Sequence, residues 1–132
     1  MYQRIIIVGR LGRDPEMRYT PQGNPVTHFP VATDFVWVDQ NGEQRKETAW
    51  FRVSVFGKQA EPCNQYLVKG QRVLVEGRLR PDPETGGPRV WIGNDGVARA
   101  SYEVVARTVR FLGKPLGKPP EVVEEAEEEI PF

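Results

Sequence analysis

Short runs of aliphatic and β-branched residues alternate with segments rich in glycine, proline and asparagine along most of the chain. Residues 4–11 (RIIIVGRL) form such a run and predict a buried strand. The turn-rich segment after them leaves room for a short strand at 17–20, and residues 26–39 predict a second long strand. Pro30 lies inside this strand and has no N–H to donate, so we expect a bulge or an unpaired edge there.

Residues 48–56 (TAWFRVSVF) show the clearest alternation, and an Asn-Gly turn signal at 40–43 precedes them. Successive side chains of a strand point to opposite faces, so this stretch has one apolar face that should meet the core. The other face carries two aromatic residues and an arginine. The apolar face consists of Phe51, Val53 and Val55, and the opposite face of Trp50, Arg52, Ser54 and Phe56.

The second half of the domain predicts a helix followed by more strands. Residues 57–70 predict the helix, with Pro62 suited to its first turn and Gly70 to its C-terminal stop. Residues 71–81 predict another strand, and residues 89–112 a hairpin that turns at an Asn-Asp-Gly sequence.

This order of elements predicts the fold class. We expect an all-β protein, a five-stranded OB-fold barrel with one short helix between strands 3 and 4, an extended β-hairpin and a disordered acidic C-terminal tail. A plain β-sandwich is the alternative, but it would not account for the helix.

Charge is divided unevenly along the chain. Residues 121–132 hold six glutamates and no basic residue, so the preceding 120 residues carry all 18 Lys and Arg against 12 Asp and Glu, a charge of +6. A basic body with an acidic tail indicates a polyanionic partner, although a solvating tail would also produce it. We expect an OB-fold domain at 1–112, a short disordered linker at 113–123 and an acidic tail at 124–132.

The sequence offers no chemistry for catalysis. Cys63 is the only cysteine and His28 the only histidine, so we expect no disulfide, no metal site and no catalytic cluster, with both residues structural. No Walker-type phosphate loop is present, and we expect neither a cofactor nor enzyme activity. The N-terminal apolar run is too short for a signal peptide or a membrane span, which predicts a cytoplasmic protein that does not bind membranes.

Aromatic residues lie beside basic ones on the predicted strand faces. Each aromatic taken singly could be a core residue, but a whole set facing solvent would be costly unless it bound something. Nucleic-acid bases stack on aromatic rings whatever their identity while Arg and Lys contact phosphates, and single strands leave the base faces free. The aromatic residues are Trp37, Trp50, Phe56 and Trp91.

Several stretches resemble the bacterial single-stranded DNA-binding protein family: IIIVGRLGRDPEMRYTPQGNPV, ETAWFRVSVFGKQAE, YLVKGQRVLVEGRL and the ending EEEIPF. The resemblance implies an OB-fold homotetramer, cytoplasmic and nucleoid-associated, that wraps single-stranded DNA without sequence preference during replication, recombination and repair. It also implies that Trp37, Trp50, Phe56 and Trp91 stack on bases, and that Arg52, Lys58, Lys69, Arg80 and Arg89 contact phosphates.

The same resemblance makes the acidic tail a docking peptide for replication, recombination and repair proteins. An aromatic anchor and neighbouring carboxylates suit an apolar pocket with a basic rim. The predicted docking residues are Glu127, Glu128, Glu129, Ile130, Pro131 and Phe132.

Two other OB-fold proteins remain alternatives. One is an RNA-binding protein that acts in translation or as a cold-shock chaperone, and the other is a primosomal-type interaction protein. Neither has a reason for the Ile-Pro-Phe ending.

Overall fold

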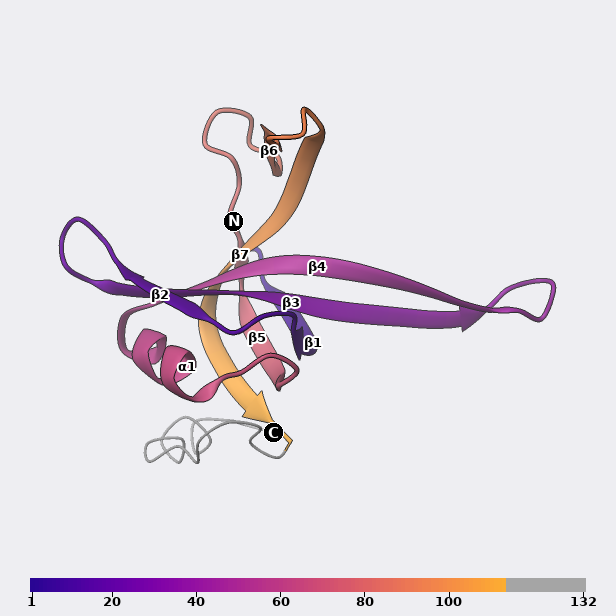
Figure 1. Cartoon of the computed structure of the whole chain (residues 1–132), viewed down its shortest axis with the longest axis horizontal. Coiled ribbons are helices and arrows are strands. Elements are labelled where there is room, and N and C mark those ends of the chain that lie inside the picture. Colours follow the sequence, from indigo (N-terminus) through magenta and orange to yellow (C-terminus); the bar gives the residue numbers. More distant parts are fainter. Residues whose placement is uncertain (114–132) are drawn as a thin grey trace.

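The structure is a computed structural model that describes residues 1–113, so the predicted acidic tail lies outside the described residues. Two short helical segments follow the fourth strand in chain order (Figure 1). The elements are β1 (Ile5–Leu11), β2 (Glu16–Tyr19), β3 (Pro25–Val38), β4 (Gln44–Phe56), the 3-10 helix η1 (Gly57–Gln59), α1 (Ala60–Tyr66), β5 (Arg72–Leu79), β6 (Arg89–Ile92) and β7 (Ala98–Leu112).

Five of the strands close into a barrel in the order β1-β5-β7-β4-β3, with β1 pairing to β3 to complete the circle. Only the contact between β4 and β7 is parallel among these pairings. The helix α1 lies between the third and fourth barrel strands, as predicted, and the closed barrel confirms the OB-fold and excludes the β-sandwich.

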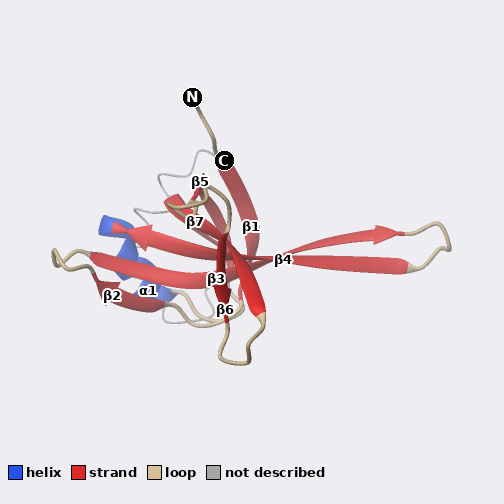
Figure 2. Cartoon of the chain, turned by 90° about the horizontal axis from the view of Figure 1, so that it is seen from above, coloured by secondary structure: helices blue, strands red, loops and turns tan. Residues whose placement is uncertain are grey.

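Two hairpins project from the barrel in different directions (Figure 2). The longer one is formed by β3 and β4, which stay paired as far as Val38 and Gln44, so β4 begins four residues before the predicted strand. The other is the β6–β7 hairpin, which turns at the predicted Asn-Asp-Gly sequence.

The core is filled by the faces that the alternation predicted. Val53 and Val55 are fully buried and Phe51 is half-buried against the core cluster. Ser54 is an exception, because it lies on the outer face yet is buried there. Cys63 is buried in the core, and its burial raises the pKa of the thiol to about 12, which leaves the thiol neutral and unreactive.

Pro30 is accommodated without a bulge. The register between β3 and β4 runs without a shift, with Pro30 opposite Arg52. On its other edge β3 changes partner, pairing with β2 up to His28 and with β1 from Val31 onward. Pro30 lies in this gap, where its carbonyl accepts a hydrogen bond from the Gly12 N–H at 3.0 Å. Of the two expected alternatives, the unpaired edge is confirmed and the bulge is absent, because the change of partner leaves a ladder position of β3 open at Pro30.

The predicted helix over 57–70 is too long. Helix α1 ends at Tyr66, and Leu67 is extended (φ −82°, ψ 144°) and buried, so the chain leaves the helix to place this side chain in the core. Gly70 is not the helix stop, although it has a φ of +89° in the turn before β5. The helix is held to β3 by the buried Thr27 hydroxyl, which donates to the carbonyl of Ala60 at 2.5 Å.

Candidate nucleic-acid interface

The outer face of β3 and β4 forms the floor of a groove between the loop before β2 and the β6–β7 hairpin. A cavity of about 410 Å³ in this groove is lined by Trp50 and Trp91, which are 41 residues apart in the sequence. Both indoles are exposed, by 52% and 39%. The structure therefore brings two of the four predicted stacking residues onto one surface.

A second cavity of about 360 Å³ continues the groove toward the β6–β7 hairpin, since Arg52 and His28 line both cavities. It brings together three of the five predicted phosphate contacts, Arg52, Arg80 and Arg89. None of these guanidinium groups forms an ion pair with any residue of 1–113. Three unpaired cations beside two exposed indoles are suited to a ligand that has both anionic groups and flat rings.

Trp50 is seated on a glycine. A Cβ atom added at Gly12 would collide with Cζ3 of the Trp50 indole and would lie 2.7 Å from Cη2. The Gly12 backbone is fixed in turn by its hydrogen bond to the Pro30 carbonyl. The loop before β2 therefore determines where the indole ring lies, and sequence reasoning missed this role of Gly12.

Trp91 is held by its neighbour on the same face of β6. The Arg89 guanidinium lies 5.5 Å from the centre of the indole, a cation–π distance. Across the hairpin, Trp91 pairs with Arg99, whose guanidinium is bound to the Asp95 carboxylate at 2.6 Å. Arg89 is thus the unpaired cation of this hairpin and Arg99 a paired one.

His28 lies at the floor of the groove rather than in the core. Its Nδ1 is 2.9 Å from the Ser54 hydroxyl oxygen, which explains why Ser54 is buried on an outer face. Burial lowers the pKa of His28, and the charges of Arg52, Arg18 and Arg80 lower it further, against a smaller opposing effect of Glu103. The sequence prediction of a purely structural histidine did not anticipate this position, because nothing in the sequence reveals which side chains of β3 lie opposite Ser54.

Phe56 and Lys58 extend the surface along β4. Phe56 shares the face of Trp50 by strand alternation and is 42% exposed, and it lies six positions further along β4, a distance of about 20 Å in a strand. Lys58 follows in η1 and is exposed. Lys69 approaches the groove from another side, since its backbone N–H donates to Oδ1 of Asp14 in the loop before β2.

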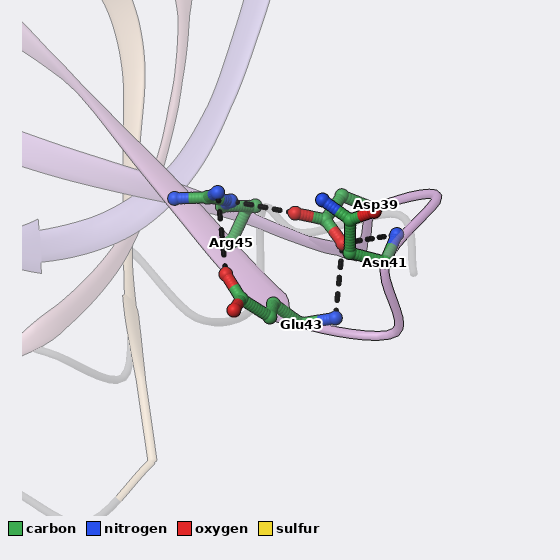
Figure 3. A network of polar contacts seen from close by, with 4 residues as sticks. All are labelled: Asp39, Asn41, Glu43 and Arg45. Carbon is green, nitrogen blue, oxygen red and sulfur yellow. Dashed lines mark hydrogen bonds and ion pairs between the residues drawn. The ribbon is translucent and has the colours of Figure 1, made fainter.

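Trp37 does not share the groove. It lies on the β3–β4 hairpin opposite Arg45, on the face of the ribbon that faces away from Trp50, and its ring packs 5.6 Å from that of Phe35. The cation opposite it is neutralised: Arg45 binds the Asp39 carboxylate at 2.8 Å and that of Glu43 at 3.3 Å (Figure 3).

The tip of this hairpin is organised around the same Asp39 carboxylate. It also accepts the backbone N–H groups of Asn41 and Glu43, both at 2.9 Å. The hydrogen bond from Arg45, followed by those from Glu43 and Asn41, lowers the pKa of Asp39 (Figure 3). The predicted docking residues of the tail lie outside the described part of the chain. Within residues 1–113, no group of His, Cys, Asp and Glu side chains could hold a metal ion, and no helix is long and apolar enough to cross a membrane.

The barrel and its groove define a class, an OB-fold protein with an exposed aromatic and cationic face. The sequence profile of the Single-strand binding protein family matches residues 2–112, and the chain belongs to this family.

Curated relatives support this assignment. The chain is 42% identical over 110 residues to a single-stranded DNA-binding protein of Neisseria meningitidis serogroup A, a match that covers 83% of this chain and 59% of the relative. It is 44% identical over 129 residues to a single-stranded DNA-binding protein of Thermotoga maritima, covering 98% and 84% of the two chains.

Solved structures show the same architecture. The SSB of Plasmodium falciparum, in a complex with single-stranded DNA, superposes with a TM-score of 0.68 at 28% identity, over 86% of this chain and 97% of that one. A deletion mutant of the single-stranded DNA-binding protein of Thermus aquaticus gives a TM-score of 0.62 at 29% identity, over 83% and 50%.

The seat of Trp50 can be tested with Gly12→Ala. We expect the added methyl group to push the indole off the loop, which raises its accessibility to acrylamide and lowers the stability of the protein by about 1 kcal/mol. The measurement is tryptophan quenching in a background with Trp37→Phe and Trp91→Phe, so that Trp50 alone is observed. Gly87→Ala is the matched control, because its nearest neighbour would be the Thr85 hydroxyl at 3.7 Å. Equal quenching in both variants would show that Gly12 does not determine the position of the Trp50 indole.

Proposed function

We propose that this protein binds single-stranded DNA without sequence preference and protects it during replication, recombination and repair. The observation that carries the proposal is the single groove in which Trp50 and Trp91 lie beside three unpaired arginines. The rings take bases and the arginines take phosphates, a division of work that does not depend on the identity of the base. Membership of the family and the DNA-bound Plasmodium structure support it.

The remaining predicted contacts extend this path. Phe56 and Lys58 continue it along β4, Lys69 adds a cation beside the loop before β2, and Trp37 offers a further ring on the β3–β4 hairpin. Because Trp37 lies on the other face of that ribbon, a strand reaches it only after leaving the groove. The proposal involves binding alone and assigns no catalytic residue.

An OB-fold RNA-binding protein would use the same aromatic surface, so the two nucleic acids must be compared directly. The names of the relatives specify single-stranded DNA, which favours DNA here. Matched DNA and RNA oligomers in parallel titrations separate the two readings.

We further propose that copies of the chain associate into a homotetramer. Ile6 and Val8 on the outer face of β1 are 61% and 52% exposed. From Ile5 to Gly9, the edge of β1 opposite β5 has no strand partner among the residues described. A bare strand edge with apolar side chains is suited to pairing with a second copy.

We propose, finally, that the acidic tail recruits replication and repair proteins. Its glutamates and Phe132 offer the combination of charge and apolar anchor described above, and the tail would dock without using the groove.

Titration with oligo(dT) tests the central proposal. We expect strong quenching of tryptophan fluorescence, and a loss of about 5- to 150-fold in affinity for Trp50→Ala or Trp91→Ala, since stacking contributes roughly 1–3 kcal/mol per base. An oligo(dT) of about 8 nucleotides fits the usual site size of an OB-fold. With this oligomer, Trp37→Ala is the matched control and should lose little affinity. For each tenfold rise in salt concentration, the logarithm of the association constant should also fall by about 0.7 per phosphate contacted. Unchanged emission at saturation would exclude stacking.

Light scattering tests the assembly. We expect four chains per particle, and a lower mass for Val8→Glu, because the substitution places a charge on the apolar edge strand. Val97→Glu changes an exposed valine at the tip of the β6–β7 hairpin and serves as the control. A monomeric parent protein would refute the tetramer.

Removal of Phe132 tests the tail. Burial of a phenylalanine side chain contributes roughly 1.5–3 kcal/mol, so its loss should weaken a tail-binding partner about ten- to hundredfold. Affinity for oligo(dT) should hardly change, because the basic groove is intact. The control is Val123→Ala, which trims an apolar residue at the end of the predicted linker, just before the tail. If removal of Phe132 lowered the affinity for the partner and the affinity for oligo(dT) equally, the tail would belong to the DNA-binding surface.

A further inference from the structure

The cavity beneath the β6–β7 hairpin concentrates positive charge more than any other part of the groove. Arg52 reaches it from β4, Arg80 from the residue after β5, and Arg89 from β6. Its volume of about 360 Å³ is many times that of a water molecule, so an anionic group can enter with part of its hydration shell.

Two carboxylates also line this cavity, but they do not neutralise it. Asp82 is engaged locally, since its Oδ1 accepts the backbone N–H of Glu84 at 2.8 Å. An oxygen of Glu103 lies 3.4 Å from the Ser101 hydroxyl. Neither carboxylate forms an ion pair with another residue in the part of the chain described. Three guanidinium groups against two carboxylates leave a net positive charge while His28 is neutral.

We propose that this cavity holds one phosphate group of the bound strand, and that His28 becomes its fourth cationic contact by taking up a proton as the phosphate enters. The inference rests on the proposed function and specifies it further. It assigns a role in DNA binding to the one histidine of the chain, which base stacking does not require.

The surroundings of His28 explain why proton uptake and phosphate binding are coupled. In the free protein, burial and then the charges of Arg52, Arg18 and Arg80 lower the pKa of His28, so the ring is neutral at pH 7. A phosphate contributes a negative charge and screens the arginines, and both effects raise the pKa. Charged groups around the ring and along the groove are Arg13 and Asp14 in the loop before β2, Glu16 and Arg18 on β2, Arg52 on β4, Arg80 and Asp82 after β5, Arg89 on β6 and Glu103 on β7.

The sign of the pH dependence follows from linkage. The bound form holds more protons than the free form between the two pKa values of His28, so affinity rises as the pH falls through that interval. A single linked proton changes the association constant by at most about tenfold per pH unit. Below the pKa of the free protein, both forms are protonated and the affinity becomes constant.

The experiment is a set of oligo(dT) titrations at constant ionic strength from about pH 5.5 to pH 8.5, with the parent protein and His28→Asn. We expect the parent to gain affinity toward low pH and the variant to lose this gain, with similar affinities for the two proteins at the alkaline end. A pH dependence that survives in His28→Asn would overturn the proposal. Absence of binding at every pH would overturn the proposed function, and this inference with it.

Nuclear magnetic resonance provides a readout that does not depend on a substitution. Because His28 is the only histidine, its Cε1–H resonance reports the protonation of this ring alone. We expect a pKa below 6.5 in the free protein and a higher value in the complex with oligo(dT). An unchanged or lower value in the complex would overturn the proposal.

A charge-matched pair of variants locates the phosphate. Arg80→Gln removes a cation from the cavity, and Arg78→Gln removes one from β5, two residues earlier, at a residue that does not line the cavity. We expect Arg80→Gln to reduce both the affinity and the upward shift of the His28 resonance on binding, whereas Arg78→Gln leaves that shift intact. Equal shifts in the two variants would place the phosphate elsewhere.

Discussion

Closure of the barrel is the constraint on which the rest of the molecule depends. β1 must bond to β5 along its length and still reach β3 at its end, which requires the backbones to approach more closely than side chains allow. Glycines occupy the two critical crossings: a Cβ atom at Gly9 would collide with the carbonyl oxygen of Ala32, and one at Gly77 with that of Val105. The register between β5 and β7 shifts at Gly77, so the sheet bends there. This curvature carries the β6–β7 hairpin over the outer face of β4, and the groove exists only because the two surfaces meet.

The distribution of ion pairs then separates the groove from the hairpins that surround it. On both hairpins, arginines are bound to carboxylates from the same turn, Arg45 to Asp39 and Arg99 to Asp95. Exposed pairs of this kind contribute little to stability, typically 0–1 kcal/mol, but they remove free positive charge from the tips. The arginines that line the two cavities of the groove, Arg13, Arg52, Arg80 and Arg89, have no such partners among residues 1–113. A polyanion is therefore drawn toward the floor of the groove rather than toward the tips.

The parts of this structure that sequence could predict are those governed by local patterns. Strand alternation placed Val53 and Val55 in the core, and the turn chemistry of Asn and Gly placed both hairpins. Prediction failed where a tertiary contact overrides a local preference: α1 stops early because Leu67 is needed in the core. At Pro30 the sequence allowed either a bulge or an unpaired edge, and the change of partner of β3 provides the unpaired edge. The site shows the same division. Composition and alternation pointed to Trp50 and Trp91, but the seat on Gly12, the place of His28 and the separation of Trp37 depend on register between distant strands.

Rigidity explains how weak individual contacts can produce useful affinity. Each stacked base contributes little binding free energy, and each exposed cation is screened by salt. The entropic cost of ordering the side chains therefore determines how much net binding free energy remains. Both indoles of the groove lie against a neighbour in the free protein, Trp50 against Gly12 and Trp91 against Arg89. The arginines that they accompany are fixed on strands or next to strand ends rather than on long loops. In the proposed function, a flexible strand meets a surface that is largely positioned before binding, and this surface accepts any sequence because none of its rings or cations distinguishes one base from another.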